Sequence, residues 1–99
     1  MTKMVNRKEL PMKVTEKELK LSLIETYVST FQEARKTMDD KYVQGRNYGM
    51  NEATSAICLL VFGGEKMMRM WELCMHHDEN EKWQNIAEEI KKEVFEGDA

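Results

Sequence analysis

Residues 51–77 read NEATSAICLLVFGGEKMMRMWELCMHH. Apolar side chains recur there every three or four residues, the period of an amphipathic helix, and the phase does not slip at Gly63-Gly64. Two adjacent glycines cost a helix about 2 kcal/mol relative to alanine. The unbroken phase nevertheless predicts one helix, capped by Asn51, with Gly64 on its buried face where another backbone can approach closely. That face comprises Ala53, Ile57, Leu60, Gly64, Met67, Trp71 and Cys74.

The apolar stripe of this helix is wider than one neighbour requires. Leu59, Val61, Met68 and Met70 extend it to about 200°, twice a single packing face. We therefore predict a symmetric homo-oligomer, because a lone helical hairpin would leave much of this arc in water. For Met67 and Trp71 the core is the favoured location, whereas Met68, Met70 and Leu73 fit core and interface equally well. The predicted interface with a partner or a second copy comprises Leu59, Leu60, Gly64, Met67, Met68, Met70, Trp71 and Leu73.

A second long helix is predicted over residues 16–44. Thr15 and Glu18 have the spacing of a capping box, which marks its beginning. Its apolar stripe comprises Ile24, Tyr27, Val28, Phe31, Ala34, Met38 and Tyr42. Two glycines and an asparagine within residues 45–49 predict the turn that reverses the chain.

A third, shorter helix is predicted over residues 80–95, after a break at residues 78–80. Its stripe comprises Trp83, Ile86, Ala87, Ile90 and Val94. The predicted fold is therefore all-α, with a long antiparallel helical hairpin and a shorter C-terminal helix. Residues 15–99 form a single helical domain in this interpretation. Residues 1–14 form a basic arm that is flexible or extended, with a short strand predicted at residues 12–14.

Composition excludes several classes of protein. The 99 residues are 41% hydrophobic and 33% charged, with nine methionines and a formal net charge of −3. This balance argues against a disordered chain and against sequence-blind binding of nucleic acid. The longest apolar run, residues 56–62, is far shorter than the roughly 20 residues that span a bilayer, and residues 1–11 are too charged for a signal peptide. We therefore expect no membrane partner and a cytoplasmic protein.

Candidate metal ligands gather in one place, at Cys74, His76, His77, Asp78 and Glu79. A structural zinc site needs four ligands, usually as two short pairs, and no second pair exists. Two histidines at a helix C-terminus are favourable without metal, because a cation there faces the negative end of the helix dipole. Cys58 and Cys74 lie among apolar residues, which predicts reduced, buried thiols. We expect no metal, no cofactor and no catalytic activity.

One polar cluster surrounds the predicted turn. A turn that delivers a helix N-terminus offers free N–H groups to an anion, two tyrosines could stack a base, and Arg46 could pair with a phosphate. Ordinary turn chemistry is the favoured explanation of the same residues. The possible anionic-ligand site comprises Lys41, Tyr42, Arg46, Asn47, Tyr48 and Asn51.

The absence of catalytic motifs and the surplus of apolar surface favour a non-catalytic helical interaction protein that binds another protein. In type, such a short, acidic, cysteine-poor helical chain resembles the small regulators and inhibitors encoded by bacteriophages and mobile elements. The alternative is an oligomeric binder of a small anionic ligand such as a nucleotide, held at the 41–51 turn where protomers meet. Weak DNA binding through the basic arm ranks third.

Overall fold

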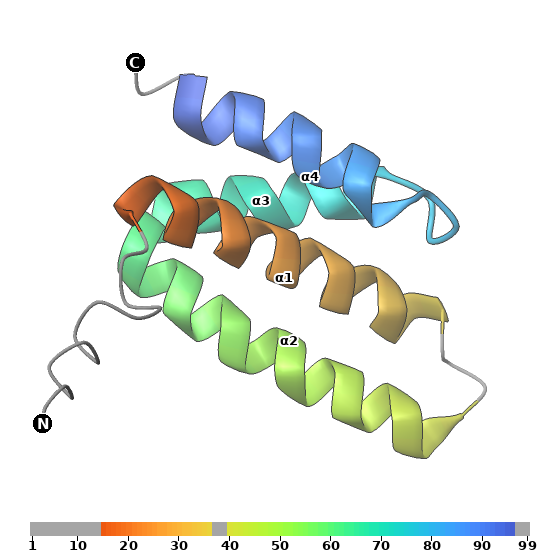
Figure 1. Cartoon of the computed structure of the whole chain (residues 1–99). Coiled ribbons are helices and arrows are strands. Elements are labelled where there is room, and N and C mark those ends of the chain that lie inside the picture. The colour runs from red at the N-terminus through yellow and green to blue at the C-terminus, as the bar shows by residue number, and fades with distance from the viewer. Residues whose placement is uncertain (1–14, 37–39, 97–99) are drawn as a thin grey trace, which may run out of the picture.

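A computed structural model describes residues 15–36 and 40–96, with the side chains up to Val94. It confirms an all-α fold in which α1 and α2 pack antiparallel as a hairpin, followed by two shorter helices (Figure 1). The elements are α1 (Glu16–Lys36), α2 (Lys41–Phe62), α3 (Gly64–His76) and α4 (Trp83–Lys91), and a π-helical turn, η2 (Lys92–Glu96), continues α4. The predicted arm over residues 1–14, its strand, and Met38 lie outside the described residues.

Helix α1 begins as predicted, with a capping box. The backbone N–H of Glu18 donates to Thr15 Oγ1 at 3.0 Å, and the Thr15 N–H donates to Glu18 Oε1 at 2.9 Å. Its predicted stripe is confirmed as core at Ile24, Val28 and their neighbours. Because α2 packs on one side of α1 and α4 on the other, α1 is the central helix of the fold.

The predicted turn at residues 45–49 is wrong. The chain reverses between Lys36 and Lys41, and residues 45–49 lie inside α2. Asp40 caps α2, because its carboxylate accepts hydrogen bonds from the N–H groups of Tyr42 and Val43, each at 3.1 Å. The negative charge of a carboxylate at this position also interacts favourably with the positive end of the helix dipole. Tyr42, assigned to the apolar stripe of the first helix, is therefore in the first turn of α2 and is 81% exposed.

Asn51 is not a helix cap, and its side chain instead joins α2 to α1 by hydrogen bonds. Its side-chain amide donates to the carbonyl of Tyr27 at 2.9 Å and to Thr30 Oγ1 at 3.0 Å. These bonds fix the rotation of α2 about its own axis. The buried residues of α2 are consequently Thr54 and Cys58, rather than the predicted Ile57 and Leu60.

The predicted continuous helix over residues 51–77 is also wrong, because it ends and restarts at Gly63. Gly63 has φ 92° and ψ 165°, a conformation open almost only to glycine. Its N–H donates to the Leu59 carbonyl and its own carbonyl accepts from the Met67 N–H, both at 3.0 Å, so the break leaves these groups satisfied. Gly64 is exposed, and a Cβ built on it would meet only Leu59 Cδ1, at 4.0 Å. The predicted burial of Gly64 is therefore incorrect.

Helix α4 covers α1 and α3 with the predicted stripe. Ile86, Ala87, Ile90 and Val94 are buried and Trp83 packs partly against them. The predicted break at residues 78–80 is confirmed, although α4 begins only at Trp83 and its N-cap residue, Lys82, makes no side-chain cap. Lys91 Nζ binds Glu25 Oε2 at 2.6 Å and so joins α4 to α1.

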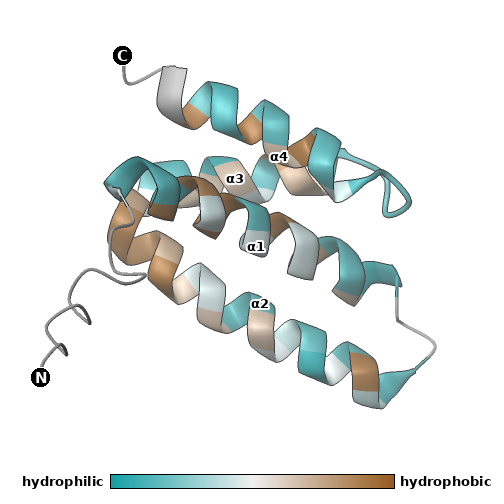
Figure 2. Ribbon diagram, in the orientation of Figure 1, coloured by the Kyte–Doolittle hydropathy of each residue, from teal (hydrophilic) through white to brown (hydrophobic). Residues whose placement is uncertain are grey.

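The described chain measures 53 × 38 × 22 Å, and its radius of gyration, 16.0 Å, exceeds the roughly 13 Å of a compact chain this long. Helix α2 lies at one edge, and its C-terminal half is coloured mostly white to brown in Figure 2. None of the described helices is both long enough and apolar enough to cross a membrane.

The two glycines at the bend give a matched test. Gly63→Ala should lower the free energy of unfolding by about 2 kcal/mol, because its φ is unfavourable for any residue with a Cβ. Gly64→Ala should be neutral or stabilising by up to about 0.5 kcal/mol, because its Cβ would make only an ordinary van der Waals contact with Leu59 Cδ1. Urea denaturation of both variants measures the difference, and equal effects would contradict the bend at Gly63.

Candidate functional site: an apolar groove between α2 and α3

The fold divides the predicted interface residues into three groups. Met70 and Leu73 are buried in the core, so they are removed from any surface. Leu60 lies on the solvent side of α2 and is 86% exposed. The other five line one hollow between α2 and α3: Leu59, Gly64, Met67, Met68 and Trp71.

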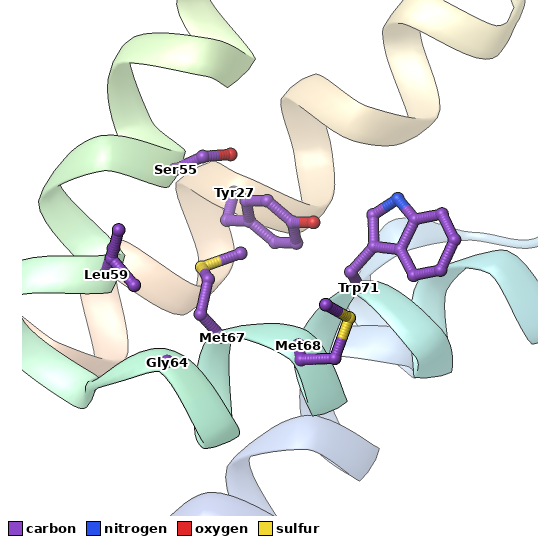
Figure 3. Close-up of a pocket in the computed structure, with 7 residues that line it drawn as sticks. All are labelled: Tyr27, Ser55, Leu59, Gly64, Met67, Met68 and Trp71. Atoms are coloured by element: carbon purple, nitrogen blue, oxygen red, sulfur yellow. The ribbon is translucent and has the colours of Figure 1, made fainter.

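This hollow has a volume of about 500 Å³, and Tyr27 and Ser55 complete its lining (Figure 3). A second hollow of about 450 Å³ shares Tyr27, Ser55 and Trp71 with it. The further lining of the second hollow comprises Phe31, Ala34, Arg35, Tyr48, Asn51, Glu52 and Met75. We call the two together the α2–α3 groove. From Gly64 to Met75 the groove follows α3 for about 16 Å, at 1.5 Å per residue.

The wall formed by α3 is apolar and adaptable. Met68, Trp71 and Met75 are 57%, 46% and 50% exposed, and Met67 is half-buried. The predicted core location of Trp71 is therefore wrong, since its indole stands at the groove. Methionine side chains are unbranched and polarizable, so they can adjust to the shape of an apolar partner.

The floor contains one polar group whose donor is unused. Tyr27 is 1% exposed, yet its hydroxyl donates no hydrogen bond to any residue in 15–36 or 40–96. Figure 3 shows the phenol directed between Met67 and Trp71. Burial raises the pKa of Tyr27, so the hydroxyl remains a donor at neutral pH. A buried tyrosine usually finds a partner, so this donor marks a place for an acceptor from beyond the described residues.

Sequence reasoning missed Tyr27 as a site residue, because its position in the α1 stripe assigned it to the core. The assignment to the core is correct, but the phenol reaches past the aliphatic core into the groove. The signal that could have found it is the hydroxyl itself, which a purely apolar stripe does not satisfy.

Two side chains of α1 hold the end of α3 in place. Gln32 is completely buried, and its amide nitrogen lies 2.9 Å from the carbonyl of Glu81 and 3.1 Å from that of Asp78. Arg35 donates to Gln32 Oε1 at 2.8 Å and to the carbonyls of Cys74 and His77 at 3.0 and 2.8 Å. We call Gln32 and Arg35 the α1 clamp. It satisfies carbonyls that the end of a helix leaves without intrahelical partners.

The predicted anionic-ligand site is not assembled. Lys41, Tyr42 and Arg46 are exposed along the first turns of α2, whereas the Asn51 amide is used against α1. The helix N-terminus lies at Lys41 rather than at Asn51, and the N–H groups of Tyr42 and Val43 there donate to the Asp40 carboxylate. Of the predicted set, only Tyr48 and Asn51 line the α2–α3 groove. The geometry on which this prediction depends is therefore wrong, because the turn lies elsewhere.

The cysteines and histidines occupy the positions expected of them. Cys58 and Cys74 are free and buried, and burial raises the pKa of these thiols to about 11 and about 12, so neither is a thiolate at neutral pH. His76 is exposed at the end of α3, and His77 Nε2 lies 2.6 Å from Glu89 Oε1. Within the described ranges, no three His, Cys, Asp or Glu side chains are grouped so that they could hold a metal ion.

No protein family matches the chain, and neither does any curated protein or solved structure.

The α1 clamp can be tested directly. Gln32→Leu should lower the free energy of unfolding by about 3 kcal/mol, because it removes three hydrogen bonds to the loop carbonyls and the acceptor that Gln32 gives to Arg35. Gln84→Leu, on the exposed side of α4, is the matched control and should change it by less than about 0.5 kcal/mol. Urea denaturation compares the two, and similar effects would show that the clamp is not required.

Proposed function

We propose that this protein is a non-catalytic binding protein whose α2–α3 groove receives an amphipathic helix of another protein. The observation that carries the proposal is the Tyr27 hydroxyl, a buried donor without an acceptor among the described residues, on the floor of a groove whose α3 wall is apolar. A partner helix supplies what the groove lacks. Its apolar side chains would cover the methionines, and one polar atom would accept from Tyr27.

The shape of the groove favours a helix over a compact small molecule. About 16 Å is three turns of an α-helix, which is the span of anchors at positions i, i+4 and i+7 to i+11. The two joined hollows could each receive one of two successive apolar anchor residues of the partner helix. Trp71 and Ser55 line both hollows, so they would lie between the two anchors. Exposed methionines are typical of grooves that accept helices of varied sequence.

Binding alone would be the activity of such a protein. The buried thiols are protonated and the groove lining has one carboxylate, that of Glu52. General acid–base or nucleophilic chemistry needs an acid, base or nucleophile within reach of a substrate, and we assign no such role to this lining. A small binding protein without its own chemistry acts by occupying a surface of its partner, which is the action of a regulator or inhibitor.

Tyr27→Phe separates stability from binding. In the free protein it should leave the free energy of unfolding unchanged or raise it by up to about 1 kcal/mol, because it removes a buried hydroxyl that has no acceptor in residues 15–36 and 40–96. Thermal and urea denaturation measure this effect. A loss of more than about 1 kcal/mol would contradict an unused donor.

Binding can be measured with helical peptides selected from a displayed library of amphipathic sequences. Peptides that bind the wild type should lose affinity by at least about tenfold against Met68→Asp and by about threefold to tenfold against Tyr27→Phe. Leu60→Asp is the matched control, because Leu60 is exposed on the same helix as Leu59 but outside the groove. Isothermal titration calorimetry gives the affinities.

The same peptides should perturb the ¹³C-methyl resonances of Met67, Met68 and Met75. If selection yields no binders, or if the binders are insensitive to Met68→Asp and Tyr27→Phe, the groove is not the binding site. If they instead respond to Leu60→Asp, binding belongs to the solvent side of α2.

A further inference from the structure

The side of α3 that borders the α2–α3 groove carries acids, and the cations of this helix point elsewhere. On a helical wheel centred on the five groove residues of α3, the exposed Glu72 and Glu65 lie about 85° and 105° from the centre. Arg69 and Lys66 lie about 145° and 155° from it. Arg69 is paired with Glu93 at 2.6 Å and more loosely with Glu72 at 3.4 Å. The solvent side of this wall is therefore negative.

The wall formed by α2 adds a third acid and no base. Glu52 lines the second hollow and is exposed, and it is the only charged residue of α2 after Arg46. Arg35 also lines this hollow, but its guanidinium donates to Gln32 and to two carbonyls at the end of α3. Three carboxylates thus border the groove, namely those of Glu52, Glu65 and Glu72.

The basic arm, residues 1–14, joins the described chain at the end of the hairpin where the groove begins. The Cys58 thiol lies 4.0 Å from the Leu23 carbonyl. Counted along the helices from that contact, Gly63 lies about 8 Å and Thr15 about 12 Å toward the same end of the hairpin. Figure 1 shows the beginning of α1 beside the end of α2. The groove starts at this end, because Gly64 lines it.

The length of the arm is sufficient to enter the groove. An extended chain spans about 3.3 Å per residue, which gives about 46 Å for this segment. A path around the bend crosses at most two helix diameters, about 20 Å, and the groove itself is about 16 Å long. About eleven of the residues would therefore be enough.

The sequence of the arm complements the groove. It contains four cations and one acid, so its side-chain charge is +3: Lys3, Arg7, Lys8 and Lys13 against Glu9. Its apolar side chains include Met1, Met4, Val5 and Leu10. Exposed ion pairs are individually weak, so the charges direct the arm to the groove while the apolar side chains and the methionine wall supply most of the contact.

We propose that the basic arm lies in the α2–α3 groove of the free protein and competes there with the partner helix. This inference rests on the proposed function of the groove. Leu10 enters nearest the bend, and Val5 and Met4 lie further along. A weak contact is enough, because a segment of the same chain has an effective concentration on the order of millimolar. The Tyr27 hydroxyl is left for the partner, which thereby gains a hydrogen bond that the arm lacks.

The position of the arm can be measured with a nitroxide attached to the full chain at Asn6→Cys. The native cysteines are buried and so are protected from the label. The nitroxide should strongly broaden the ¹³C-methyl resonances of Met67, Met68 and Met75. The same label at Gln84→Cys, on the exposed side of α4, is the control and should broaden them much less.

A mixed sample distinguishes the arm of the same chain from that of a second copy. Nitroxide-labelled chain without ¹³C is mixed with ¹³C-methyl chain without nitroxide. The methionine resonances should stay sharp in this mixture. Broadening there would show that the groove receives the arm of another copy, and it would overturn the contact within one chain.

Competition is measured with the helical peptides selected for the groove. Leu10→Asn should raise their affinity for the full chain by about threefold to tenfold, because it weakens the competing segment, and it should reduce the broadening. Thr2→Asn is the matched control. It introduces the same residue into the same segment without removing an apolar side chain, and it should leave the affinity within about twofold of wild type.

The charges have a separate test. Glu65→Lys reverses one carboxylate at the groove and should lower the ratio of bound to free arm by about twofold, which reduces the broadening from the nitroxide at residue 6. Glu79→Lys makes the same change on an exposed loop residue away from the groove and should leave the broadening unchanged.

Sharp resonances at all three methionines in the labelled full chain would overturn the proposal. So would a Leu10→Asn protein that binds the peptides no better than wild type does. If the peptides bind and respond to Met68→Asp while the broadening is absent, the proposed function stands and only this inference fails. If the nitroxide broadens the methionines but no peptide binds, even to Leu10→Asn, the arm occupies the groove and the proposed function fails instead.

Discussion

The fold depends on a buried polar contact between the ends of two helices. Helix α3 leaves its last carbonyls without intrahelical partners, and the loop that follows turns away from the core before α4 begins. Arg35 of α1 donates to the carbonyls of Cys74 and His77, and the fully buried Gln32 donates to carbonyls of the following loop. Because this loop leads directly into α4, which packs on α1, the clamp joins the second half of the chain to the hairpin.

The clamp also creates the groove. Helices α2 and α3 separate from the bend at Gly63, and the far end of α3 is held on α1 rather than on α2. Tyr27 forms the floor of the space between them. Most of the other side chains that line this space lie outside the buried core. Helices α2 and α3 are joined at Gly63, and the other end of α3 is bound to α1. The space between α2 and α3 therefore stays open while the core beneath it remains packed. Rigid support and adaptable methionines are thus combined in one site.

Two adjacent leucines illustrate how one helix serves two surfaces. Leu59 lines the groove and Leu60 faces solvent outside it, because successive helical residues differ by about 100° in direction. Asn51 sets which way each of them points, through its bonds to α1.

By itself the sequence determined those features that depend on near neighbours: the capping box at Thr15 and Glu18, the α1 and α4 stripes, and the break at residues 78–80. It misplaced the hairpin turn, because a carboxylate cap at Asp40 outweighs glycines that a helix can absorb at about 1 kcal/mol each. It missed the bend at Gly63, because one residue in a glycine-only conformation did not disturb the apolar period. Five of the eight predicted interface residues do line the groove. The sequence pattern did not, however, distinguish Met70, which is buried in the core, from Met68, which is exposed at the groove. Only the tertiary structure decided which side of α2 is buried. That helix is apolar on several sides, and the hydrogen bonds of Asn51 to α1, made across 21 and 24 residues of chain, select Thr54 and Cys58 over the more hydrophobic Ile57 and Leu60.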